Sequence, residues 1–130
     1  MEHLYFYRDE DLFCHHTVDA CPDPKNFPIH AHEFMEALCF LSGRGEYLVE
    51  GSTYSLHPGD ILVMRPAEAH KLMITPEEPY ERIAVHFSRR IVSPFGEELL
   101  RPFLIARWES AISIPARSIR DCGAPLTRWT

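Results

Sequence analysis

HAHEFMEALCFLSG, residues 30–43, carries the strongest structural signal in this chain of 130 residues. The segment has the apolar and aromatic composition of a β-strand, and side chains two residues apart in a strand lie on the same face. A continuous strand from residue 29 would therefore point His30, His32 and Glu36 to one side. Three apolar side chains have the same parity and would surround these polar groups: Phe34, Leu38 and Phe40. The segment thus predicts a pocket in which two imidazoles and one carboxylate lie in apolar surroundings.

Turn signals on the C-terminal side of this segment divide the chain into short strands. Gly51-Ser52 indicates a tight hairpin between two short runs, and HPGD at residues 57–60 indicates a second turn. PEEP at residues 76–79 ends a later run, and YERIAVHF at residues 80–87 reads as the last clear strand. Six or seven short strands therefore lie between residues 29 and 87. This spacing is typical of an antiparallel sandwich or barrel, so we expect an all-β fold.

The two ends of the chain follow other patterns. LYFYR at residues 4–8 predicts a short strand, and the prolines of CPDPKNFP at residues 21–28 predict an ordered loop. Ser93-Pro94 predicts a helix start, with Ser as N-cap and Pro at the first helical position. The helix would have two or three turns and end near Pro102. For residues 103–130 we expect one or two short strands or turns and a loose end.

Composition and charge exclude several functions. The chain is 45% hydrophobic and 25% charged, which is ordinary for one soluble domain of this length. The net charge is −6 and the first hundred residues hold no cluster of Lys or Arg, so we expect no direct binding to nucleic acid. No apolar run is long enough to cross a bilayer, and the N-terminus lacks a signal pattern. We therefore expect a cytoplasmic protein without a membrane partner.

His70 adds a third imidazole from a separate part of the chain, after a turn at Gly59 and a loop at Pro66. Three His and one Glu suit a divalent first-row metal such as Zn, Ni, Mn or Fe. From the residues alone, a metal site, a metal-free polar pocket for a small ligand and purely structural histidines all remain open. Burial of Glu36 would in each case require a cationic or hydrogen-bond-donating neighbour.

Two segments resemble the sequence motifs of the cupin superfamily. HAHEFMEALCFLSG is similar to the first motif, HxH, three residues, Glu, six residues, Gly, with His30, His32, Glu36 and Gly43 at those positions. GDILVMRPAEAH is similar to the second motif, which His70 ends. The glycine that opens the first motif and the asparagine that follows the second are missing. The resemblance implies a cupin-type double-stranded β-helix (jelly-roll) barrel with a short C-terminal helical segment, and a metal held by His30, His32, Glu36 and His70.

A narrower resemblance covers residues from about 27 to 105. YLVEGSTYSLHPGDILVMRPAEAHKL, followed by YERIAVHFS and then SPF, is similar to the N-terminal sensor domain of AraC-family transcription regulators. The resemblance implies that residues 1–105 form an effector-binding barrel, with core motifs at residues 30–87, and that residues 106–130 form an extension or linker. In that family the sensor binds a small effector, often a sugar, forms homodimers, and is joined to helix-turn-helix modules. We expect no such DNA-binding domain within this chain.

Four further residues are candidate ligand contacts: Arg82, His86, Tyr47 and Phe34. Arg82 and His86 share one face of the strand at residues 80–87, and Arg82 could hold a carboxylate or a sugar hydroxyl. The opposite face is mostly apolar and is expected to be the core side: Glu81, Ile83, Val85 and Phe87. Tyr47 and Tyr54 could stack on a sugar ring or pack as a hairpin pair. Three histidines outside the motifs are expected at the surface: His3, His15 and His16.

Three functions follow from these features. The first is a ligand-sensing module of a transcription regulator, which needs a pocket but no catalytic residue. The second is a stand-alone metal-dependent cupin enzyme, an isomerase or a dioxygenase, in which His86 is the one side chain available as acid or base. The third is a sugar-binding or storage barrel. We expect the first, and we expect that the chain is not an enzyme.

Overall fold

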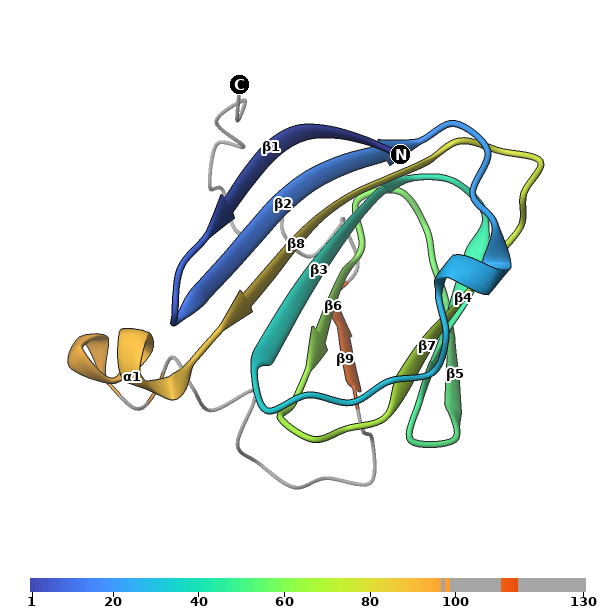
Figure 1. Cartoon of the computed structure of the whole chain (residues 1–130). Coiled ribbons are helices and arrows are strands. Elements are labelled where there is room, and N and C mark those ends of the chain that lie inside the picture. The colour runs from blue at the N-terminus through green and yellow to red at the C-terminus, as the bar shows by residue number, and fades with distance from the viewer. Residues whose placement is uncertain (97, 99–110, 115–130) are drawn as a thin grey trace, which may run out of the picture.

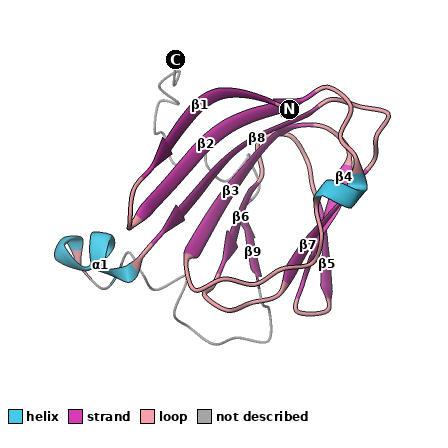
Figure 2. Cartoon of the chain, viewed as in Figure 1, coloured by secondary structure: helices cyan, strands magenta, loops and turns pink. Residues whose placement is uncertain are grey.

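The computed structural model describes residues 1–96, 98 and 111–114, and its regular elements are almost all strands (Figures 1 and 2). In chain order these elements are β1 (Glu2–Arg8), β2 (Leu12–Asp19), η1 (Pro24–Asn26), β3 (Met35–Ser42), β4 (Gly45–Val49), β5 (Ser52–Ser55), β6 (Ile61–Met64), β7 (His70–Ile74), β8 (Tyr80–Phe87), α1 (Arg89–Val92), η2 (Ser93–Phe95) and β9 (Ala111–Ile114). The all-β class is confirmed, as are the six strands between residues 29 and 87.

The strands form two antiparallel sheets. A six-stranded sheet has the order β1-β2-β8-β3-β6-β9, and a three-stranded sheet has the order β5-β4-β7. Figure 1 shows β4, β5 and β7 together on one side of the molecule, apart from the larger sheet. One buried cluster draws residues from both sheets, so the core lies between them: Leu38, Phe40, Tyr47, Val49, Leu56, Leu62, Met64, Leu72, Ile74, Tyr80 and Ala84.

Two of the expected turns are present. Val49 and Ser52 pair across β4 and β5, and the two residues between them, Glu50 and Gly51, both have positive φ (45° and 83°). This is the backbone of the two-residue turn that best suits the twist of a hairpin. In the HPGD turn Gly59 has φ 92°, and the Asp60 carboxylate accepts a hydrogen bond of 2.9 Å from the His57 backbone N–H.

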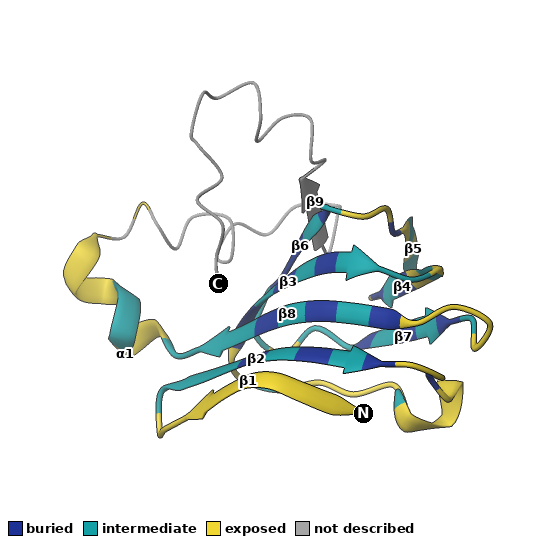
Figure 3. Cartoon of the chain, turned by 90° about the horizontal axis from the view of Figure 1, so that it is seen from above, coloured by how far each residue is buried: buried dark blue, intermediate teal, exposed yellow. Residues whose placement is uncertain are grey.

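The inner face of β8 is the opposite of the expected one. Tyr80, Arg82 and Ala84 are buried, whereas the strand neighbours of these residues are only partly buried. The alternation of buried and half-buried residues along β8 is visible in Figure 3. The prediction was wrong because the average polarity of a face does not decide its direction when a polar side chain such as Arg82 is buried. Register explains the outcome, since Arg82 lies opposite the fully buried Phe40 of β3.

β2 was not predicted from the sequence, and two of its histidines, His15 and His16, were expected at the surface. The strand lies between β1 and β8, and its inward residues His15, Thr17 and Asp19 are buried. The prediction of a surface position for His15 was therefore wrong. His16, on the opposite face, is half-buried and lies 2.7 Å from the Glu81 carboxylate. The polar composition of this segment hid the strand, because its inner face is lined by polar rather than apolar side chains.

The C-terminal segments differ in part from expectation. The helix begins at Arg89, with Ser88 as its N-cap, so the prediction of Ser93 as N-cap was wrong and Ser93 is the C-cap instead. The expected continuation of the helix toward Pro102 falls largely outside the described residues. β9 pairs with β6, which confirms a short strand within residues 103–130. Among the helices of the described residues, none is long and apolar enough to cross a membrane.

Candidate functional site

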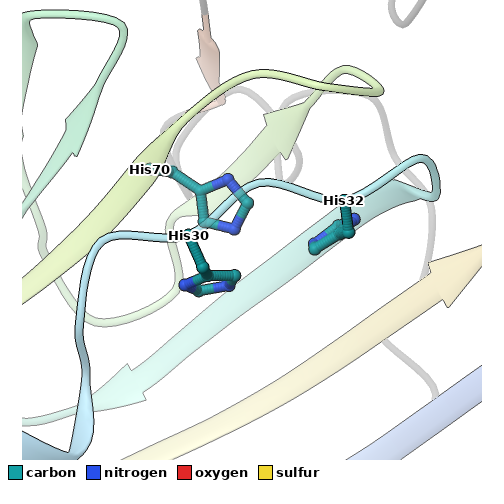
Figure 4. Close-up of side chains that lie close together, drawn as sticks. All are labelled: His30, His32 and His70. Carbon is teal, nitrogen blue, oxygen red and sulfur yellow. The ribbon is translucent and has the colours of Figure 1, made fainter.

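Three histidines from two distant segments lie side by side (Figure 4), with His30 exposed, His32 half-buried and His70 buried. His30 and His70 form an isolated β-bridge with two backbone hydrogen bonds, N–H to O distances 3.0 and 2.9 Å. The ring centroids of His30 and His70 are 4.2 Å apart, and those of His32 and His70 are 5.1 Å apart. His70 is 1% exposed and lies next to the HxH pair, as the resemblance to the cupin motifs implied.

The route of the chain to this cluster differs from the expected continuous strand. β3 begins only at Met35, whereas His30 is bridged to β7 of the other sheet. Residues 31–34 therefore carry the chain from one sheet to the other, and the shared parity of His30, His32 and Glu36 is not what brings their side chains together. The backbone of His32 is held separately, because its carbonyl accepts a hydrogen bond of 2.7 Å from the Ala67 N–H.

Glu36 is the centre of the cluster. Its Oε2 atom lies 3.1 Å from His32 Nε2, 3.3 Å from His70 Nε2 and 3.0 Å from His86 Nε2. Glu36 is 4% exposed and lies opposite His86 in the β3–β8 register. His86, expected as a ligand contact, is therefore a fifth member of the cluster. One buried carboxylate is thus surrounded by three imidazole nitrogens.

Backbone carbonyls orient three of the rings. The Nδ1 atoms of His30, His32 and His70 lie 3.0, 3.1 and 2.9 Å from the carbonyl oxygens of Pro28, Phe34 and Glu68. When such a ring is neutral, an Nδ1–H bond to a carbonyl leaves the lone pair on Nε2 for a metal; when it is protonated, Nε2–H can donate to Glu36 at the same time. Metal-binding histidines are commonly oriented in this way, since the second-shell bond fixes both the tautomer and the ring plane.

The electrostatics of the cluster favour an ionised carboxylate. Burial alone would raise the pKa of Glu36, but the imidazoles of His32, His70 and His86 outweigh that effect and hold its pKa well below the ordinary value. Burial likewise acts to lower the pKa of His70, but the contact with Glu36 reverses the effect and raises it. The negative charge of Glu36 is therefore retained inside the fold and is available to a cation.

The donor set fits a divalent first-row metal. Two overlapping triads have their ligand atoms within 4.8 Å of one another: His30, His32 and His70, and His32, Glu36 and His86. The buried Nε2 atoms of His70 and His86 have no hydrogen-bond partner in the described part of the chain, although both lie near Glu36. Nitrogen donors with one carboxylate suit Zn, Ni, Mn or Fe, and unpartnered buried nitrogens are the atoms that a metal would satisfy.

The interior beyond the cluster is mostly apolar, with a few polar groups. Tyr47 is 5% exposed and its ring centroid is 6.0 Å from that of His70. It is also the register partner of Tyr54, as expected for a hairpin pair. Arg82, 9% exposed, lies on the inner face of β8. Phe34 differs from these residues, because it precedes β3 and is 37% exposed. An apolar interior with few convergent polar groups is the usual form of a small-molecule site.

A separate groove of about 690 Å³ lies beside the three-stranded sheet. Its walls include Gly45, His57 and Lys71, and it contains none of the five cluster residues. The chemistry predicted from the two motifs therefore belongs to the interior between the sheets and not to this groove.

Comparison with known proteins supports the motif-based expectations. The family model for the AraC-like ligand binding domain matches residues 16–114, which is most of the chain. The match includes all five cluster residues as well as Tyr47 and Arg82. No curated protein matches the chain significantly.

Several solved structures share the fold at low sequence identity. A cupin 2 conserved barrel domain protein from Salinispora arenicola is 20% identical, with a TM-score of 0.54 over 75% of this chain and 82% of that one. AerE from Microcystis aeruginosa is 16% identical, with a TM-score of 0.61 over 85% of this chain and 46% of that one. The DMSP lyase DddQ from Ruegeria pomeroyi is 23% identical, with a TM-score of 0.51 over 62% and 40%. These likenesses confirm the cupin-type jelly-roll barrel.

Proposed function

Because the chain belongs to the family of AraC-like ligand-binding domains, we propose that it is the effector-sensing part of an AraC-type transcription regulator. The effector is a small molecule that binds between the two sheets, beside the buried cluster around Glu36. A sugar is the class of effector that the family resemblance favours. The observation that carries the proposal is a set of oriented imidazoles around the buried Glu36 carboxylate, beside an apolar interior. Such a set can position a ligand without any residue that performs chemistry on it.

We further propose that a divalent metal belongs to this site. His30, His32, Glu36 and His70 are the residues that would hold it. His86 lies close enough to Glu36 to contact the carboxylate beside the metal. When bound, Zn, Ni, Mn or Fe would supply a Lewis acid for an oxygen atom of the effector. The chain's own residues contribute the rest: backbone carbonyls orient the rings, and Tyr47 and the apolar core exclude water.

The proposal has consequences for assembly and location. A sensor acts by shifting the balance between two arrangements of a larger assembly, which for this family is a homodimer. We propose that residues 1–105 form the sensing unit, that residues 106–130 lead toward the rest of the regulator, and that the protein acts in the cytoplasm without itself contacting DNA. Light scattering after size exclusion, with and without a bound effector, measures whether the protein is a homodimer. A mass of one chain under both conditions would contradict the dimer.

A compound screen tests the sensing function directly. The purified chain is incubated with sugars, sugar acids and other small metabolites, with and without added Ni or Mn. Binding is followed by thermal shift and confirmed by calorimetry. We expect a hit to be recovered chemically unchanged by mass spectrometry. Conversion of a hit into product would instead identify an enzyme.

The second candidate function is a metal-dependent cupin enzyme. It is favoured by His86, whose Nε2 lies 3.0 Å from Glu36 Oε2 and is otherwise unpartnered among the described residues. A side chain so placed could hold or move a proton beside a bound substrate. The His86→Gln variant separates the two functions. If the protein is a sensor, neither the wild type nor the variant should convert the ligand chemically. If it is an enzyme, the wild type should convert the ligand and the variant should lose turnover.

A further inference from the structure

Arg82 is a buried cation in the interior that the cluster does not use. It is 9% exposed and projects from the inner face of β8, two residues from Tyr80 and two from Ala84. In the register of the large sheet it lies between Thr17 of β2 and Phe40 of β3, both completely buried. A guanidinium remains charged at any physiological pH. The fold therefore keeps a permanent positive charge between its sheets.

No carboxylate of the described residues neutralises this charge. Arg82 forms no ion pair there, and its buried Nη1 atom has no hydrogen-bond partner. Its contacts are with two aromatic residues: the guanidinium carbon lies 4.6 Å from the ring centroid of Tyr80, whose hydroxyl also interacts with it, and 5.4 Å from that of Phe27. Aromatic faces attract a cation, but they do not replace the hydrogen bonds that five N–H donors can make. A buried charge with no carboxylate partner and an unsatisfied Nη1 is costly to folding, so its presence requires an explanation.

The charge of Arg82 acts across the space between the sheets. It opposes the rise in the pKa of Tyr47, a residue of the facing sheet, which burial and Glu36 push well above the ordinary value. It also contributes, after burial, to the lowered pKa of His15 on the neighbouring strand. These effects agree with the burial of Arg82 on the inner face of β8, beside Tyr80 and Ala84 of the core cluster.

We infer that Arg82 anchors a carboxylate group of the effector, so that the molecule sensed is an organic acid. This inference rests on the proposed sensing function and narrows the chemical class of its ligand. A carboxylate matches the planar guanidinium with two parallel N–H···O bonds, which satisfies the unpartnered donors and neutralises the charge. The aromatic contacts with Tyr80 and Phe27 hold the guanidinium in place before the ligand arrives. A sugar acid would meet this requirement and a neutral sugar would not.

Matched probe pairs test the inference on the full chain. The pairs are benzoate with benzamide and glucuronate with glucose, which differ in the charged group while keeping similar shapes. The protein is labelled with ¹⁵N-arginine, and the Arg82 Nε–H signal is assigned by its loss in Arg82→Met. We expect a saturable shift of this signal with at least one carboxylate and none with its neutral partner. Calorimetry should show that the carboxylate binds at least about 100-fold more tightly.

Two variants separate ligand binding from a structural role. Arg82→Met removes the unpartnered charge and keeps most of the side-chain volume, so the ligand-free protein should melt at least about 3 °C higher. The same variant should lose the binding of the carboxylate. Arg82→Lys keeps the charge without the planar pair of donors and should bind the carboxylate about tenfold more weakly. The control is Arg90→Met, at an exposed arginine 2.5 Å from the Asp11 carboxylate, which should leave carboxylate binding unchanged.

Three results would overturn the inference. One is a lower melting temperature of ligand-free Arg82→Met together with unchanged carboxylate binding, which would make Arg82 structural. Another is an equal shift of the Arg82 signal with both members of a pair. The third is the absence of any saturable shift with either carboxylate. A neutral compound that binds equally well to the wild-type protein and to Arg82→Met would support the sensing function but contradict the inference that the effector is an organic acid. Conversion of a bound carboxylate into product would contradict the proposed sensing function. It would not contradict the role of Arg82 in binding the carboxylate.

Discussion

At the residue scale, the site depends on Glu36 and on how its neighbours are oriented. The four motif residues could be predicted because each belongs to a local pattern that is readable without knowledge of the fold. His86 was predicted only as a ligand contact and not as a neighbour of Glu36, and His15 was placed at the surface. Their positions follow from the pairing of β8 with β3 and with β2, and register between strands far apart in sequence is not visible in composition.

Glu36→Gln should weaken metal binding by at least about tenfold. The amide keeps the shape of the side chain but removes the negative charge that the three imidazoles surround. Titration with Ni followed by calorimetry measures the change. Glu33→Gln is the matched control, because Glu33 lies three residues away on the surface. Equal affinity of both variants for Ni would contradict the role given to Glu36.

His15 should make stability depend on pH. Burial first, then the charges of Arg82 and His86, lower the pKa of His15 from 6.5 to about 4. Between these values the unfolded chain binds a proton that the folded chain does not. The free energy of unfolding should therefore fall as the pH is lowered from about 6.5 to about 4, by about 1 to 2 kcal/mol after allowance for solvent screening.

Urea titrations with a chelator present, at pH 7 and at pH 4.5, measure this effect. His15→Asn keeps a polar atom near the Thr17 hydroxyl, which lies 2.6 Å from His15 Nδ1, but it cannot titrate. The difference in stability between the two pH values should be smaller in the variant. An identical difference in the two proteins would show that other groups cause the pH dependence.

At the element scale, the strands between residues 29 and 87 and their turns were predictable because each has a local signature. The start of β3 and the direction of β8 were not. His30 pairs with the opposite sheet, and no local pattern shows that the chain leaves one sheet for the other at residues 31–34. β8 turns its more polar face inward, so that Tyr80, Arg82 and Ala84 are buried and His86 lies beside Glu36.

β4 offers a direct measure of which face is buried. Val49 is 0% exposed, whereas the adjacent Leu48 faces the other way and is only partly buried. Val49→Ala should therefore lower the free energy of unfolding by about 2 kcal/mol, and Leu48→Ala by less than about 1 kcal/mol. Val49→Ala removes fewer atoms than Leu48→Ala but destabilises the protein more, because it leaves a cavity in the core. Chemical denaturation of both variants gives the comparison, and the reverse order would place the core on the other face.

At the scale of the whole molecule, the cluster joins the two sheets. His70 belongs to the three-stranded sheet, whereas Glu36 and His86 belong to the six-stranded sheet. A metal held by residues of both sheets would bind only the folded chain. At a free metal concentration 100 times the dissociation constant, it should raise the free energy of unfolding by about 2.7 kcal/mol.

Thermal melts with Ni, Zn, Mn and Fe measure this stabilisation. Glu36→Gln should lose most of it, and a chelator should reverse it in the wild-type protein. His57→Gln is the control at an exposed histidine outside the cluster, and it should behave as the wild type does. Equal stabilisation of Glu36→Gln and the wild type would show that the ions act at surface groups.

Anomalous diffraction from a crystal grown with Ni or Zn tests most directly whether the imidazoles and the carboxylate hold one ion between the sheets. We predict a single strong peak inside the barrel, at about 2.0 to 2.2 Å from Nε2 of His30, His32 and His70 and from a carboxylate oxygen of Glu36. Peaks confined to surface histidines such as His3 or His57, with none between the sheets, would contradict the account.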